Sequence, residues 1–257
     1  MSNPLANPKY TITEVAPKIY HIQFDNRVDT ALHFLRYSEY FESVSESFFR
    51  RPFFLMDYIA WYAKNNGGDF SYANDWSGFN VPGFVFEKFF RGFFQGELQL
   101  DINSFDRRMM EIINKIRTTY NLRSYDWNFY LVGTSKSSKE DEFEDKEEDV
   151  LDHEVAHGLF ATNFQYRSDM MKLIEELPTK FVKQFKKQLF KFGYNNDVHS
   201  DEIQAYLSTG ANPDWLDYEK FGTEQEFSDK RPAFIETFRK HKNESTTTSS
   251  NTSESQN

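Results

Sequence analysis

The chain has 257 residues, no cysteine, a net charge of −10 and a mean hydropathy of −0.72. The lack of cysteine excludes disulfides, thiolate metal sites and a cysteine nucleophile, and the acidic balance argues against general affinity for nucleic acid phosphates. Because no stretch approaches ~18 apolar residues and no signal peptide begins the chain, we expect no membrane span and a cytoplasmic location.

The first half of the chain alternates between strand and helix patterns. Alternating apolar residues predict two short strands within residues 10–24. Helices are expected over 30–50, 55–64 and 84–95, followed by a strand over 97–102. Residues 71–83 are punctuated by Gly, Asn and Pro and are predicted to form a loop. Its Trp76 and Phe79 either line a cleft or anchor the loop to the core.

The second half is predicted to be helical around one strand. Ser104 is the expected N-cap of a helix that runs to Arg117, and the WNFYLVGT pattern over 127–134 is typical of a strand. Helices are then expected around His153 up to about 163, and over 167–176, 179–192, 197–207 and 232–240. The acidic run over 139–149 is either a solvated loop or a guide for a cation or basic substrate. Residues 243–257 have no apolar side chain and are predicted to form a disordered tail.

These patterns predict an α+β fold that is mostly helical with a small mixed sheet. We expect an N-terminal mixed α/β region over 1–125, with a metal-binding region over 126–242 packed on it. The metal site is expected where the strand of the second region meets its helices.

A metal-binding pattern lies at His153-Glu154-Val155-Ala156-His157. Residues four apart share one face of a helix, so His153 and His157 can present two imidazoles to one ion. Glu154 then projects beside the ion, where it can act as general base toward an attacking water. Apolar residues surround the three, and buried imidazoles and carboxylates are costly unless something satisfies them.

A catalytic zinc site needs a third protein ligand. Our first candidate is Glu202 in the segment DEIQAY, and His199 and Asp201 are the alternatives. Glu202 and Tyr206 are four residues apart, so the Tyr206 hydroxyl can steady Glu202 or a developing oxyanion. Tyr166 is a second candidate for an oxyanion donor.

With these residues in place, DHEVAHGLF and the downstream DEIQAY resemble the zincin superfamily in its glutamate-ligand branch, the gluzincins. The resemblance covers roughly residues 127–210 and implies a zincin-like active-site helix in a zinc peptidase. It implies Zn²⁺ ligands at His153, His157 and Glu202, with Glu154 as general base. The chain is also similar to bacterial and viral proteins that share HExxHG, a following TNxxY and DEIQAYL. Tyr206 stands where many gluzincins have Asp.

The expected function is zinc-dependent hydrolysis of a peptide or protein, with strand 127–134 pairing with an extended substrate as an edge strand. One alternative is a catalytically inactive zincin-like protein in which a structural metal staples the core and function comes from protein interaction. Others are a zinc hydrolase for a non-peptide substrate and two ordinary core histidines beside a chance glutamate. A metal site with an open coordination position in a cleft indicates an enzyme, whereas a closed site indicates a structural metal. The sequence carries no signal for an oligomeric state.

Overall fold

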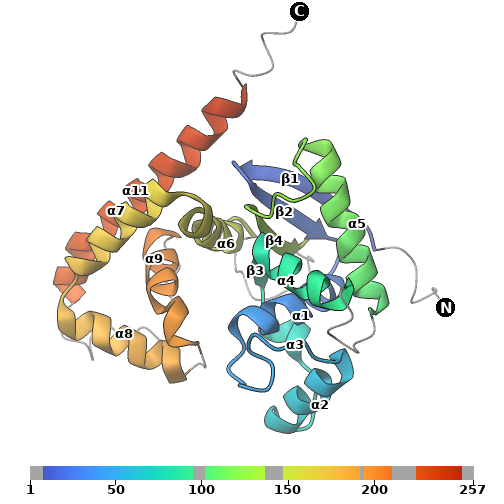
Figure 1. Ribbon diagram of the computed structural model, residues 1–257. Coiled ribbons are helices and arrows are strands. Elements are labelled where there is room, and N and C mark those ends of the chain that lie inside the picture. The colour runs from blue at the N-terminus through green and yellow to red at the C-terminus, as the bar shows by residue number, and fades with distance from the viewer. Residues whose placement is uncertain (1–7, 95–101, 137–146, 192–193, 210–223, 251–257) are drawn as a thin grey trace, which may run out of the picture.

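The computed structural model describes residues 8–94, 102–136, 147–191, 194–209 and 224–250. The fold is α+β, mostly helical around a small mixed sheet, which confirms the predicted fold class. One group of helices comes from the first half of the chain and lies beside the sheet, and the other comes from the second half (Figure 1). Within the described residues, no helix combines the length and apolar character needed to cross a bilayer.

The sheet has the strand order β1-β2-β4-β3. Its strands are β1 (Tyr10–Ala16), β2 (Ile19–Phe24), β3 (Gly78–Pro82) and β4 (Tyr130–Ser135). Strands β2 and β4 pair in parallel, whereas β1 and β3 pair antiparallel with their neighbours. Because β4 is internal, the expectation that 127–134 is an edge strand open to a peptide is wrong. The strand at this edge of the sheet is β3, which pairs with β4.

The predicted loop over 71–83 is also wrong, because this segment contains a helical turn and a strand. The turn is α3 (Tyr72–Asp75), and β3 follows it. The ladder between β3 and β4 pairs Phe79 with Gly133 and Val81 with Leu131. Tertiary pairing thus overrides the turn propensity of Gly, Asn and Pro, as β-propensity commonly yields to context.

The first helical group packs an aromatic core against one face of the sheet. It comprises α1 (Arg27–Glu42), α2 (Leu55–Asn65), α3, α4 (Gly83–Phe94) and α5 (Ser104–Thr119). Gly133 of β4 is required for this packing, since a Cβ there would lie 2.3 Å from the Phe34 ring. The N-cap of α5 is Asn103, not the predicted Ser104. Asn103 forms a capping box with Asp106, which satisfies free N–H groups at both positions.

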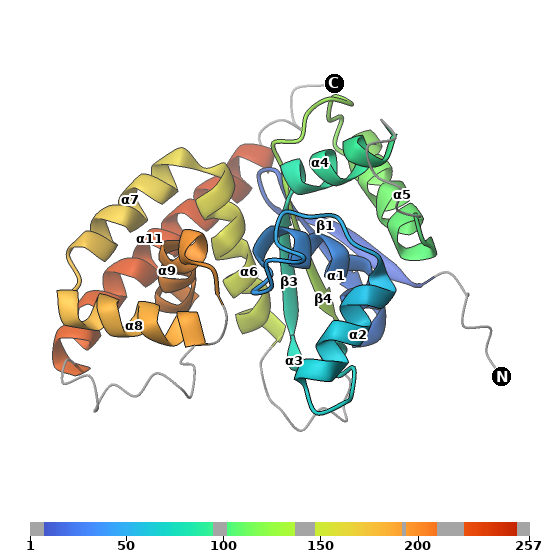
Figure 2. The same cartoon turned by 60° about the horizontal axis from the view of Figure 1, so that its bottom comes forward.

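The second helical group covers the opposite face, where Ile19, Tyr130 and Val132 point. It comprises α6 (Glu147–Thr162), α7 (Phe164–Glu175), α8 (Thr179–Lys191), the 3₁₀ turn η1 (Asn196–Val198), α9 (His199–Thr209) and α11 (Glu224–Ser250). Helix α6 lies between the sheet and α9 (Figure 2). A Cβ at Gly158 would lie 2.8 Å from the Ile19 side chain, so this glycine lets α6 approach β2 closely.

The remaining predictions concern chain ends and connections. Helix α11 runs to Ser250, beyond residue 242, where we expected the ordered chain to end. Residues 251–257 of the predicted tail lie outside the described residues, as do most of the predicted strand over 97–102 and of the acidic run over 139–149. The predicted regions 1–125 and 126–242 share one sheet, because β4 of the second completes the ladder built by the first.

Candidate metal centre

Helices α6 and α9 bring the three candidate ligands together. The Nε2 atoms of His153 and His157 are 3.3 Å apart, and His157 Nε2 lies 3.7 Å from Glu202 Oε1. One ligand atom from each residue falls within 4.8 Å of the others. Tetrahedral zinc with bonds of about 2.0–2.2 Å separates its ligand atoms by roughly 3.3–3.6 Å. The donor set therefore fits zinc after small side-chain adjustments.

A buried carboxylate oxygen of this cluster supports the fit to a metal ion. Glu202 Oε2 and His153 Nδ1 have no hydrogen-bond partner among the described residues. Buried polar atoms are nearly always paired, and an unpaired one is costly. For Glu202, a cation beside the carboxylate removes that cost.

The two other candidates for third ligand have different partners. Asp201 Oδ1 lies 2.9 Å from Nδ1 of His157, the ring nitrogen that faces away from His153. A carboxylate only accepts, so His157 Nδ1 carries a proton and Nε2 is the ring nitrogen left to bind a metal. His199 Nε2 lies 3.1 Å from the backbone oxygen of Tyr194. Asp201 thus orients a candidate ligand, and His199 holds the backbone before α9.

Behind Asp201, a chain of hydrogen bonds fixes the arrangement. Gln204 Nε2 donates to Asp201 Oδ1 at 2.9 Å and to the backbone oxygen of Ala156 at 3.3 Å. Tyr166 donates its hydroxyl to Gln204 Oε1 at 2.6 Å, in the core of the helical group. The expected role of Tyr166 as an oxyanion donor is wrong, because its hydroxyl supports the back of the site.

Glu154 is held on the opposite side by the edge strand. Asn80 of β3 donates from Nδ2 to Glu154 Oε2 at 2.7 Å, and the Tyr130 hydroxyl donates to Asn80 Oδ1 at 2.5 Å. A Cβ at Gly78 would lie 2.5 Å from Glu154 Oε1, so glycine is what leaves room for the carboxylate. Asn80 is absent from the predicted site because residues 71–83 are predicted to form a loop; the alternation of apolar Phe79 and Val81 around it is the signal that favours a strand.

Burial and neighbouring charges shift the pKa values of His153, Glu154, His157 and Glu202. Burial, together with neighbouring His157, lowers the pKa of His153 well below its usual value. Burial also favours neutral His157, but the carboxylates of Asp201 and Glu202 outweigh it and raise the pKa of His157. Burial raises the pKa of Glu154, and it raises the pKa of Glu202 to about 8 against the opposing effect of His157.

Two tyrosines lie close to the candidate ligands, Tyr206 on the side away from the adjoining cavity and Tyr194 on the cavity side. The Tyr206 ring packs on His153 with centroids 4.6 Å apart, but Tyr206 is not among the described residues that line the adjoining cavity. Tyr194 does line it, and the hydroxyl groups of the two tyrosines are hydrogen-bonded to each other. Tyr194 is therefore a further candidate site residue, which the sequence patterns do not single out.

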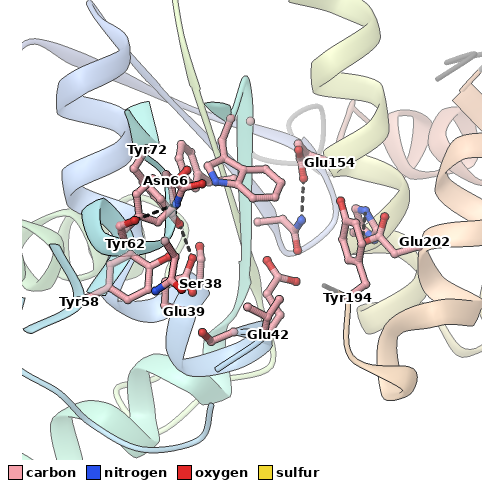
Figure 3. A pocket seen from close by; sticks show the side chains of 18 of the residues that line it. Ser38, Glu39, Glu42, Tyr58, Tyr62, Asn66, Tyr72, Glu154, Tyr194 and Glu202 are labelled. Carbon is pink, nitrogen blue, oxygen red and sulfur yellow. Dashed lines mark hydrogen bonds and ion pairs between the residues drawn. The ribbon is translucent and has the colours of Figure 1, made fainter. Parts of the chain in front are cut away.

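A cavity of about 430 Å³ adjoins the cluster (Figure 3). His153, Glu154, His157 and Glu202 line one end of it. Trp76 and Phe79 both line it as well, and Phe79 is also a core residue that stacks on Phe34. The donor set is thus open to a small molecule or an extended chain on one side. Comparisons with protein-family models, curated proteins and solved structures found no match for this chain.

Proposed function

We propose that the protein is a zinc-dependent hydrolase, most simply a metallopeptidase, with His153, His157 and Glu202 as its metal ligands. The observation that carries this proposal is the convergence of three ligand atoms within 4.8 Å on the wall of a cavity, beside the carboxylate of Glu154. Zinc, when bound, lowers the pKa of a water molecule and polarises a carbonyl group.

Residues of the protein supply the general base, the positioning contacts and the oxyanion donor. Glu154 takes the proton of the attacking water and passes it to the leaving amine, which is general acid–base catalysis. Asn80 holds Glu154 in position through its amide. Asp201 holds the His157 ring by its Nδ1 atom. Tyr194 supplies a hydroxyl on the cavity side, backed by Tyr206, for the developing oxyanion.

The edge strand β3 supports a peptide as substrate. It pairs with β4 along one side, and three of its residues, Gly78, Phe79 and Asn80, line the cavity. An extended peptide can add to such a strand through main-chain hydrogen bonds, which brings a carbonyl group past Glu154.

A structural metal in a non-catalytic interaction protein is the second candidate. A structural zinc site is closed by four protein ligands, whereas a catalytic site keeps one position open. The candidate cluster supplies three ligands beside a cavity, which favours the enzyme.

The test compares Glu154→Gln with wild type and with Glu175→Gln, which removes a carboxylate from the exposed side of α7. We expect one zinc per chain in all three by metal analysis. Cleavage of a peptide library should fall by about 10²- to 10⁴-fold in Glu154→Gln alone. Wild type without zinc would overturn both metal proposals, and zinc with no cleavage of any peptide would favour the structural metal.

A further inference from the structure

The cavity beside the candidate metal centre ends in a wall of aromatic rings. Tyr58 and Tyr62 come from α2, and Tyr72 comes from α3. The Tyr72 ring centroid lies 5.7 Å from that of Tyr58 and 5.3 Å from that of Tyr62, both edge-on. Trp61 and Trp76 line the same cavity beside them. This end therefore offers ring faces and edges, which attract cations as well as apolar groups.

Two carboxyl groups of α1 face this aromatic end. Glu39 Oε1 accepts the Tyr72 hydroxyl at 2.9 Å, and the hydroxyls of Tyr58 and Ser43 are also hydrogen-bonded to Glu39. Glu42, about one turn later, lines the cavity without a hydrogen bond or ion pair to any described residue. In the close view, Glu42 lies between the tyrosine group and Glu202 (Figure 3). Glu39 is thus fixed in place, and Glu42 is available to a ligand.

The charges that line the cavity do not balance. Its described lining contains four carboxyl groups, on Glu39, Glu42, Glu154 and Glu202, but neither lysine nor arginine. A zinc dication at the metal centre offsets the pair nearest to it, Glu154 and Glu202. Glu39 has three hydroxyl donors, but burial raises the pKa of Glu42 and no lysine or arginine of the described lining faces its carboxylate. A ligand cation supplies the compensation that such groups need.

We propose that this end of the cavity binds the basic side chain, arginine or lysine, of a peptide substrate and so directs cleavage to sites beside basic residues. This specificity rests on the proposed hydrolase function. An apolar side chain would fit the rings but leave the Glu42 carboxylate buried without a partner, which disfavours it. A guanidinium or ammonium group meets both the ring faces and the carboxylate.

Binding is tested apart from cleavage, in the Glu154→Gln background. The probes are the tripeptide Ala-Arg-Ala, acetylated and amidated, and its counterpart with neutral citrulline in place of arginine. Calorimetric titration should show the arginine peptide binding at least tenfold more tightly. Adding Glu42→Gln should abolish that preference. Adding Glu46→Gln, which removes an exposed carboxylate just after α1, should preserve it.

Three outcomes would overturn the inference. One is equal binding of the two peptides, and another is an arginine preference that survives Glu42→Gln in protein with an unchanged thermal unfolding midpoint. The third is equally tight binding of a tri-alanine peptide with a free amino terminus, which would place the α-amine in this site. The proposed function fails separately: a charge preference in binding without any cleavage by wild type keeps the cation site and removes the hydrolase. Cleavage without preference for basic residues keeps the hydrolase and removes the cation site.

Discussion

Two clusters of buried charged side chains among the described residues, one in each helical group, differ in how their charges are met. In the first, Arg36 of α1 pairs with Asp106 of α5. Asp106 also accepts the Tyr37 hydroxyl and the Asn103 backbone N–H, each at 3.0 Å, and Arg36 donates to the backbone oxygen of Phe53 at 2.6 Å. This cluster contains its own cation, and both carboxylate oxygens have donors.

The second cluster, at α6 and α9, is built in the opposite way. It gathers three carboxyl groups around two imidazoles, and the Glu202 carboxylate, unlike that of Asp106, has a buried oxygen without a donor among the described residues. The balanced cluster serves folding, whereas the α6/α9 cluster should gain stability from the cation that we propose as its ligand. The two should therefore respond in opposite ways to mutation and to metal.

The largest effect is expected from breaking the balanced pair. Asp106→Ala leaves the Arg36 guanidinium buried without its carboxylate and removes the capping box of α5. We expect the free energy of unfolding to fall by about 3–5 kcal/mol, as when one partner of a buried ion pair is removed. Urea denaturation measures the change.

The matched control is Glu111→Ala on the same helix, which removes the exposed partner of Arg108. A surface pair of this kind contributes less than about 1 kcal/mol. Similar losses for Asp106→Ala and Glu111→Ala would show that the Arg36–Asp106 pair has no special weight.

Metal should stabilise the unbalanced cluster by the next largest amount. Zinc that binds only the folded state, at a free concentration 100 times its dissociation constant, adds about 2.7 kcal/mol to the free energy of unfolding. We expect this gain in wild type, its reversal by a chelator, and little gain in Glu202→Gln. Magnesium serves as control, because it prefers oxygen ligands in an octahedral site. A zinc response unchanged in Glu202→Gln would exclude Glu202 as a ligand.

The two clusters also differ in how far the sequence specifies them. His153, Glu154 and His157 follow from helical spacing, and Glu202 follows from a second helix with the right residue types, because both patterns are local. Alternation around Asn80 could indicate a strand, but its place beside Glu154 could not be predicted, since it depends on residues 78–82 pairing with β4.

The aromatic end of the cavity was missed for the same physical reason. The sequence of α1 shows an aromatic stripe and no sign of a site at Glu39 or Glu42. Their place in the cavity lining depends on α3, which packs on α1, and on Tyr58 of α2, which is hydrogen-bonded to Glu39. The misassigned edge strand has a similar cause: periodicity predicts that 127–134 is extended, but strand order is a property of the whole sheet. The candidate ligands and general base follow from local sequence patterns, whereas the residues around them are placed by tertiary packing.

A smaller effect is expected from the residue behind a ligand. Asp201→Asn leaves His157 without the carboxylate that fixes its tautomer. Metal affinity should fall by about 10- to 100-fold, as for other outer partners of metal-bound histidines. Competition with a chromogenic zinc chelator measures it. The control is Asp197→Asn, since Asp197 forms an exposed pair with Arg50. An equal loss in both variants would show that general acidity, and not ring orientation, governs metal affinity.

The smallest effect concerns the carboxyl group at the aromatic end that already has donors. Burial raises the pKa of Glu39, although hydrogen bonds from Tyr58, Ser43 and Tyr72 oppose it. A carboxyl group with a raised folded-state pKa contributes stability that is complete below its unfolded pKa of about 4.3 and is lost as pH rises through the folded pKa.

We therefore expect Glu39→Gln to flatten the fall in unfolding free energy between about pH 4 and pH 7 and to be the more stable protein at neutral pH. Urea denaturation across this range measures the slope. Glu46→Gln, which removes an exposed carboxylate, should keep the wild-type slope. If Glu39→Gln kept it as well, the three hydroxyl donors would fully offset the burial of Glu39. That end of the cavity would then be as balanced as the Arg36–Asp106 cluster, with Glu42 alone left for a ligand cation.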